Sequence, residues 1–170
     1  MSKIRLAGVI RESIVDGPGI RLTVFTQGCP HNCEGCHNPQ THDFNGGYIS
    51  DTNNILKAIK QNPILQGVTF SGGEPFMQCP PLTELAKECH NLGLNVMVYT
   101  GYTFEQLING FEKNPQWKEL LENIDILVDG PFIMAERSLM LHFRGSKNQR
   151  ILDVAKSLQT GKAIRREDLE

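Results

Sequence analysis

The sequence predicts an α/β protein whose sheet forms a partial, open parallel β/α barrel of five or six units. Short β-rich runs alternate with amphipathic stretches, and the connections between them are too short for anything but βα units. A closed eightfold barrel needs about 250 residues. Since the chain has 170 residues, the barrel is expected to stay open on one side.

Each expected element follows from a local pattern. Residues 21–27 combine Thr, Val and Phe and end before a glycine, as a strand does. Ser50 or Asp51 can cap a helix that ends at 62–63, and Pro81 suits the first turn of a helix that ends before Gly93. The other expected elements are strands at 67–71, 94–100 and 124–128, a helical region at 104–121, and short apolar pieces at 139–143 and 151–154 that complete the sheet.

A glycine-containing polar turn follows each expected strand. The turns read QGCP, SGGEP, TGY, VDGP and, after the piece at 139–143, FRGS. In parallel α/β folds the carboxyl ends of the strands face the active site. The turns therefore predict one shared site along one rim of the sheet.

Composition sets the broad class. With 17 Lys and Arg against 19 Asp and Glu, the net charge of −2 gives no general attraction to nucleic acid or anionic membrane. No apolar run approaches the roughly 20 residues of a membrane span, and residues 1–10 lack a signal-peptide pattern. We expect a cytoplasmic protein in which residues 1–170 form a single domain, with a mobile tail from about residue 161.

Five cysteines in a protein expected to be cytoplasmic argue against a disulfide framework, and an odd number fits poorly with complete pairing. Cys29, Cys33 and Cys36 form the pattern CxxxCxxC, while Cys79 and Cys89 stand alone and are expected to be structural or incidental. Thiolates hold 4Fe–4S clusters, usually four per cluster. Three cysteines in one loop would leave one iron open to a small molecule.

Zinc is the alternative occupant of this loop. Zinc sites are usually closed by four ligands. One histidine near the three cysteines could supply the fourth ligand; the candidates are His31, His37 and His42.

The order of the motifs resembles the radical S-adenosylmethionine superfamily, since CxxxCxxC follows the first strand and SGGEP follows the next. The resemblance implies that the three cysteines bind one 4Fe–4S cluster and that S-adenosylmethionine chelates its fourth iron. It also implies a glycine-rich strip at the methionyl amino group, matched here by Ser71, Gly72, Gly73 and Glu74. Without the cysteines, SGGEP could equally be an ordinary turn between strand and helix.

One position departs from the superfamily pattern. Many members carry an aromatic residue directly before the third cysteine, where it packs near the adenine. Here that residue is Gly35. The family pattern therefore implies adenine contacts, partly through the backbone, from Gly35, Cys36 and His37.

Further motifs narrow the resemblance to the activating proteins of anaerobic ribonucleoside-triphosphate reductases. The similarity runs from about residue 10 to 155 and rests on DGPGIR, GCPHNCEGCHNPQTHDF, TGY, VDGPF and FRGSKNQR, of which VDGPF and FRGSKNQR are the specific parts. It implies an enzyme to which a flavodoxin-like donor delivers one electron. Reductive cleavage of S-adenosylmethionine would then yield a 5′-deoxyadenosyl radical, which takes hydrogen from a glycine of the large reductase subunit.

In this scheme no catalytic residue is needed beyond the cluster ligands. The alternatives are an activase of another glycyl-radical enzyme, of the pyruvate formate-lyase type, a small iron–sulfur electron carrier, and a zinc-binding adaptor. Arg144, Lys147 and Arg150 could bind the S-adenosylmethionine carboxylate or the partner, or form a solvated loop. Asp129 could cap a strand end or contact the ribose.

Overall fold

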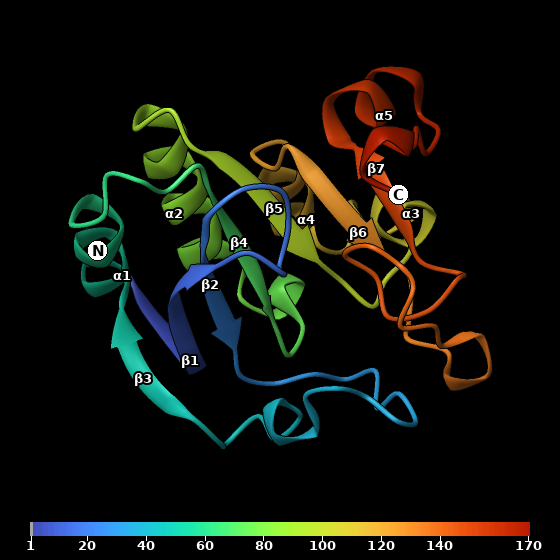
Figure 1. Cartoon of the computed structure of the whole chain (residues 1–170), viewed down its shortest axis with the longest axis horizontal. Coiled ribbons are helices and arrows are strands. Elements are labelled where there is room, and N and C mark those ends of the chain that lie inside the picture. Colours follow the sequence, from blue (N-terminus) through green and yellow to red (C-terminus); the bar gives the residue numbers. More distant parts are fainter. Residues whose placement is uncertain (1) are drawn as a thin grey trace.

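The computed structural model describes residues 2–170 as one seven-stranded sheet with helices (Figure 1). The strands are β1 (Lys3–Ser13), β2 (Arg21–Thr26), β3 (Tyr48–Asp51), β4 (Gly67–Gly72), β5 (Asn95–Tyr99), β6 (Ile126–Asp129) and β7 (Arg150–Asp153). The helices are α1 (Thr52–Lys60), α2 (Cys79–Asn91), α3 (Phe104–Asn109), α4 (Pro115–Leu121) and α5 (Val154–Thr160). The strand order is β3-β1-β2-β4-β5-β6-β7.

The open α/β sheet is confirmed, whereas five or six parallel units are not. Neighbours among β2, β4, β5 and β6 pair in parallel, but β7 pairs antiparallel with β6, and β1 pairs antiparallel with β2 and β3. The piece expected at 151–154 lies mostly in β7, and residues 139–143 form turns and bends. β7 can reverse direction because an irregular segment, not a crossover helix, leads to it from β6.

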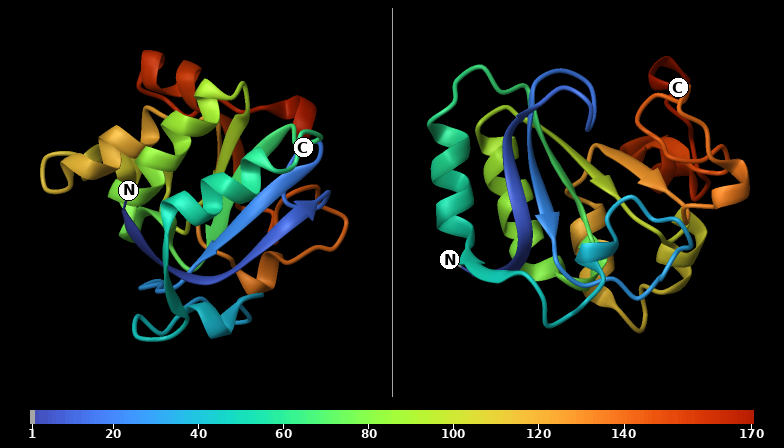
Figure 2. Two further views of the ribbon diagram at one scale, coloured as in Figure 1. Left: turned by 90° about the vertical axis from the view of Figure 1, so that its left-hand side faces the viewer. Right: turned by 60° about the horizontal axis from the view of Figure 1, so that its bottom comes forward.

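The two faces of the sheet have different roles, which follow from the alternation of side chains along each strand. One face packs against helices in the main core and contributes Leu22, Val24, Val68, Phe70, Val96, Val98 and Leu127. The opposite face carries a smaller apolar cluster of Met97, Ile126, Val128 and Ile151. Figure 2 shows α1 and α2 together on one side of the sheet.

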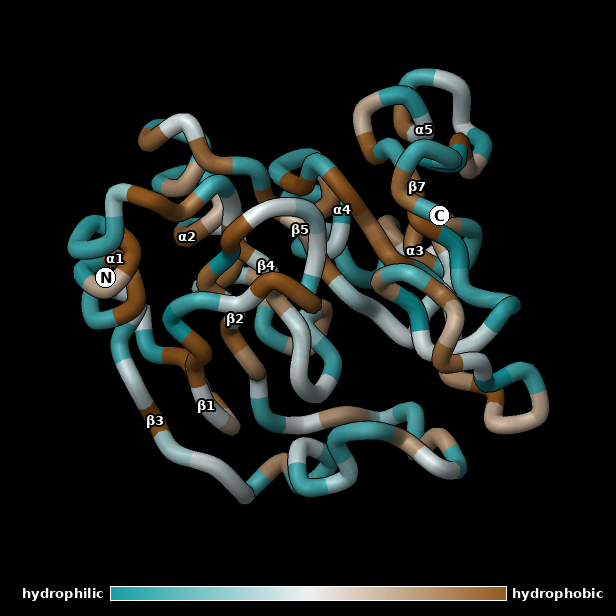
Figure 3. Tube along the Cα trace, in the orientation of Figure 1, coloured by the Kyte–Doolittle hydropathy of each residue, from teal (hydrophilic) through white to brown (hydrophobic). Residues whose placement is uncertain are grey.

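The helices begin and end at recognisable signals. Asp51 caps α1 by accepting a hydrogen bond from the Asn53 amide at 2.8 Å, as the sequence allowed. α2 begins two residues before Pro81. Figure 3 shows hydrophobic residues along β1, β2 and β6, while the loop after β2 is largely polar or neutral.

The segment after α5 pairs with β7. The Asp153 amide donates to the Ile164 carbonyl at 2.8 Å, and the Arg166 amide donates to the Ile151 carbonyl at 2.7 Å. The mobility expected from residue 161 and the single-domain boundary stay predictions. Within residues 2–170, no helix has the length and apolar character needed to cross a membrane.

Candidate functional site

A cavity of about 490 Å³ lies at the carboxyl ends of the parallel strands. The turns after β2, β4, β5 and β6 all reach it, so the predicted convergence of the strand-end turns holds for these four strands. Among the residues that line it are Cys29, Cys33, Cys36, His37, Ser71, Gly72, Gly73, Tyr99, Thr100, Gly130, Phe143 and Arg144. The FRGS turn also reaches the cavity, although no strand precedes it.

The three motif cysteines lie on the cysteine loop, which comprises residues 28–37. All three are free, partly exposed thiols, and all three line the cavity. The loop begins with Gly28 at a φ of 106°, where its amide donates to the Thr41 carbonyl at 2.7 Å. Burial raises the pKa of the Cys29 thiol, and a metal ligand must be the thiolate form.

This donor set fits three corners of a 4Fe–4S cluster, since three free thiols from one loop face one cavity. Residues 2–170 contain no group of three or more His, Cys, Asp or Glu side chains placed to hold a single metal ion. All three histidines that could close a zinc site line the cavity, and Nε2 of His31 also lies 2.6 Å from a carboxylate oxygen of Glu74.

The glycine strip comprises residues 71–74, and three of its four residues line the cavity. The glycines also touch protein backbone. A Cβ on Gly72, whose φ is 92°, would lie 2.5 Å from the Thr26 amide nitrogen, and one on Gly73 would lie 2.4 Å from the Gly28 carbonyl oxygen. Glycine is therefore required because the strip packs directly on the chain that leads into the cysteine loop.

Two of the expected site residues do not line the cavity. Glu74 is fully buried, and its carboxylate accepts hydrogen bonds from Thr100, Gly101 and Phe76. Gly35 has a φ of 70° and faces Met134, whose sulfur would lie 2.9 Å from an added Cβ.

The β6–β7 loop, residues 130–149, forms another part of the cavity wall. Its Phe132 ring lies 4.9 Å from the His37 ring, centroid to centroid, which joins this loop to the cysteine loop. The Gln149 side-chain oxygen accepts from the amides of Gly145 and Ser146 at 2.8 and 3.1 Å. The Gln149 side chain thus stabilises a turn within the FRGSKNQR motif.

The structure separates the three basic residues of that motif. Arg144 lines the cavity with its side chain only 8% exposed, and its Nε has no hydrogen-bond partner within residues 2–170. One of its terminal nitrogens donates to the Gln149 carbonyl at 3.1 Å, and the Glu170 carboxylate lies 3.9 Å away. Lys147 is exposed.

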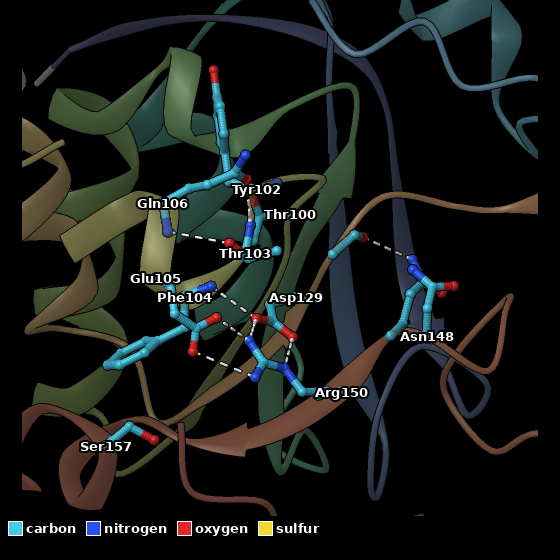
Figure 4. Close-up of polar contacts among 12 residues, drawn as sticks. Thr100, Tyr102, Thr103, Phe104, Glu105, Gln106, Asp129, Asn148, Arg150 and Ser157 are labelled. Carbon is cyan, nitrogen blue, oxygen red and sulfur yellow. Dashed lines mark hydrogen bonds and ion pairs between the residues drawn. The ribbon is translucent and has the colours of Figure 1, made fainter. Parts of the chain in front are cut away.

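Arg150 instead forms an ion-pair clamp away from the cavity (Figure 4). Its guanidinium contacts both carboxylate oxygens of buried Asp129 and also binds Glu105. Asp129 accepts from the Phe104 amide at 2.8 Å as well, so it ties β6 to β7 and to the start of α3. Hydrogen bonds to Asp129 raise the pKa of Arg150 further above its ordinary value.

The two isolated cysteines are buried in the main core and do not line the cavity. Burial raises the pKa of both Cys79 and Cys89 to about 12, which keeps them protonated at neutral pH. Several cavity residues were not predicted from sequence. Tyr99, the last residue of β5, is one of them, and Asp16 reaches the cavity from the β1–β2 turn, whereas Thr100 was expected there as part of the TGY turn.

Comparison with known proteins adds independent information. Residues 15–152 match the family described as "4Fe-4S single cluster domain". The anaerobic ribonucleoside-triphosphate reductase-activating protein of Haemophilus influenzae is 33% identical over 146 residues, covering 80% of this chain and 89% of that protein. Its Escherichia coli K12 counterpart is 34% identical over 152 residues, covering 80% and 90%. Among solved structures, Escherichia coli QueE matches 59% of this chain and 54% of its own, with a TM-score of 0.46 and 18% identity.

Proposed function

This chain belongs to the family of anaerobic ribonucleoside-triphosphate reductase-activating proteins, and we propose that it activates such a reductase with one 4Fe–4S cluster and S-adenosylmethionine. When bound, these two groups supply a reductively generated 5′-deoxyadenosyl radical, which takes hydrogen from a glycine of the large reductase subunit. The observation that carries the proposal is that three free thiols and the glycine strip meet in one cavity.

The protein's own residues hold and enclose the two groups. Cys29, Cys33 and Cys36 are the proposed cluster ligands. The backbone at residues 71–73 lines the cavity without side chains larger than a hydroxymethyl group, so a ligand can approach it closely. Cys36 and His37 are the proposed adenine contacts. The His37 ring also packs against Phe132 of the β6–β7 loop.

Arg144 is the proposed anion-binding residue of the cavity. Its guanidinium is largely buried in the cavity wall, its Nε has no hydrogen-bond partner within residues 2–170, and the Glu170 carboxylate lies 3.9 Å from one of its terminal nitrogens. A carboxylate group of a bound ligand would supply the missing partner. By contrast, Asp129 and Arg150 form a hydrogen-bonded ion pair with each other, which favours a structural role for both.

The macromolecular partner is proposed to reach the cavity from its open rim. Val15 and Phe143 line the cavity from two loops, and those loops also carry strongly exposed apolar side chains. Leu139 and Met140 are 92% and 88% exposed. Exposed apolar clusters beside a site often mark protein–protein contacts.

The electron donor is proposed to be flavodoxin-like, and the place of action to be the cytoplasm, where thiols stay reduced. The test is anaerobic incubation with dithionite and S-adenosylmethionine, followed by assay for 5′-deoxyadenosine. Adding the large reductase subunit should give a glycyl-radical signal in electron paramagnetic resonance. Absence of 5′-deoxyadenosine would contradict the proposed chemistry. A radical on pyruvate formate-lyase, and none on the reductase, would contradict the proposed partner.

A further inference from the structure

His31 occupies a distinctive position between the first two cysteines of the cysteine loop. Its Nε2 lies 2.6 Å from Oε1 of Glu74, which belongs to the glycine strip 43 residues further along the chain. The imidazole also packs edge-on against Tyr102, with 4.5 Å between ring centroids. A Cβ on Gly101 would lie 2.4 Å from the His31 ring, so the imidazole fits closely against that turn.

Glu74 joins several strand ends at one carboxylate. Its Oε1 accepts from the Gly101 amide at 2.8 Å and from the Thr100 hydroxyl at 2.8 Å, and its Oε2 accepts from the Phe76 amide at 3.0 Å. A fully buried carboxylate must be hydrogen-bonded to be tolerated. These donors come from the turns after β4 and β5, so Glu74 fixes both turns in place.

The cysteine loop has few other connections to the sheet. At its start, the Gly28 carbonyl accepts from the Glu74 amide at 2.8 Å, and the amides of Gly28 and Cys29 donate to the carbonyls of Thr41 and His42, which lie outside the sheet. In the part of the chain that the structure describes, the hydrogen bonds of residues 30–36 are otherwise local, such as the Cys36 amide to the Cys33 carbonyl. Within residues 2–170, the contact between His31 and Glu74 is therefore the one hydrogen bond that joins residues 30–36 of this loop to the strand-end turns.

We propose that His31 is a positioning residue that fixes the cysteine thiols relative to the glycine strip by binding Glu74. The inference rests on the proposed function, because the thiols and the strip would hold the cluster and S-adenosylmethionine respectively. Loss of this contact would leave all three thiols present but free to shift relative to the strip. Cluster content should then survive, while S-adenosylmethionine binding should weaken.

The test compares three variants of the full-length protein. His31→Ala removes the contact, and His31→Gln keeps a side-chain N–H that can reach the Glu74 carboxylate. The matched control is His90→Ala, which removes a histidine–carboxylate hydrogen bond of 2.8 Å to Asp125, remote from the cavity. If His31→Ala does not fold, His31→Leu serves as the second variant without the hydrogen bond.

The first readout needs no cluster. In the apoprotein, hydrogen–deuterium exchange of residues 29–37 and 72–75 should rise at least tenfold in His31→Ala and stay near wild type in His31→Gln and His90→Ala. The second readout is the Kd for S-adenosylmethionine, from its effect on the electron paramagnetic resonance spectrum of the reduced cluster. His31→Ala should raise this Kd at least tenfold at unchanged iron content, and His31→Gln should restore it.

Unchanged exchange in His31→Ala would overturn the proposal, as would unchanged S-adenosylmethionine binding. Failure of His31→Gln to restore either property would also overturn it. If the wild-type protein itself did not bind S-adenosylmethionine, the proposed function would fail, while the exchange experiment would still decide whether His31 fixes the loop.

Discussion

Substitution of Gly73 should disturb the cysteine loop as well as the ligand side of the glycine strip. A Cβ at this position would lie 2.4 Å from the Gly28 carbonyl oxygen and 2.9 Å from its carbon. Backbone atoms cannot turn aside as a flexible side chain can. Gly73→Ala therefore requires the chain before Cys29 to move by about 1 Å, a form of overpacking.

That movement would disturb two backbone hydrogen bonds. The Gly73 amide donates to the Thr26 carbonyl at 2.8 Å, and the Glu74 amide donates to the Gly28 carbonyl at 2.8 Å. Overpacking of this kind costs about 1–3 kcal/mol. At roughly 2–4 °C per kcal/mol for a chain of this size, the melting temperature of the apoprotein should fall measurably.

The assay is thermal unfolding of the apoprotein, together with iron content and S-adenosylmethionine binding after anaerobic reconstitution. We expect Gly73→Ala to lower the melting temperature, to reduce iron content and to weaken binding at least tenfold. The control is Gly8→Ala, because an added Cβ on Gly8 meets no atom within 4 Å. A Gly73→Ala protein with wild-type stability, iron content and binding would refute the reasoning.

Three other predictions test separate parts of the site. Replacing any one of the three motif cysteines by Ala should abolish S-adenosylmethionine cleavage. Cys79→Ala should retain cleavage and also the cluster, measured as about four irons per chain. Loss of the cluster in the Cys79 variant would contradict the ligand assignment. Arg144→Met should weaken S-adenosylmethionine binding with little loss of stability. Arg150→Met should leave the buried Asp129 carboxylate without its ion-pair partner and cost about 3 kcal/mol of unfolding free energy, measured by denaturant titration. The opposite pattern would reverse the roles assigned to the two arginines. Leu139→Ser should lower radical yield on the reductase, while reductant-driven cleavage of S-adenosylmethionine without the partner stays constant. The control is Ile64→Ser, at a residue that is 53% exposed and remote from the cavity, which should change neither property. Equal effects of both substitutions would argue against partner binding at the exposed apolar residues beside the cavity.

The central parallel strands could be predicted from sequence because each is a short β-rich run bounded by turn residues. The two strands on the other side of β2, β1 and β3, could not. β1 alternates only at its start, where Ile4 and Leu6 are buried, and its later residues up to Glu12 are partly or fully exposed. β3 is four residues long and has no buried side chain. Both strands depend on pairing with their neighbours, which a local pattern does not record.

The convergence of the strand-end turns could also be predicted, because parallel strands carry their carboxyl ends to one edge. The direction in which individual side chains point could not. Glu74 belongs to a motif expected to face the ligand, yet its side chain turns inward to the strand-end turns. Arg144 and Arg150 are alike in charge and close in sequence, but Arg150 lies beside Asp129 and Glu105, whereas Arg144 lines the cavity.

The glycine strip and the cysteine loop behave as one structural unit, which gives a physical reason for their joint occurrence. Backbone hydrogen bonds join Gly73 to the end of β2 and Glu74 to Gly28, and His31 returns from the cysteine loop to the Glu74 carboxylate. A larger residue at Gly73 would displace the thiols, and a change at His31 would release them from the strip. The two motifs therefore constrain each other through direct contact, and the spacing between the thiols and the strip is set by the protein before any ligand binds.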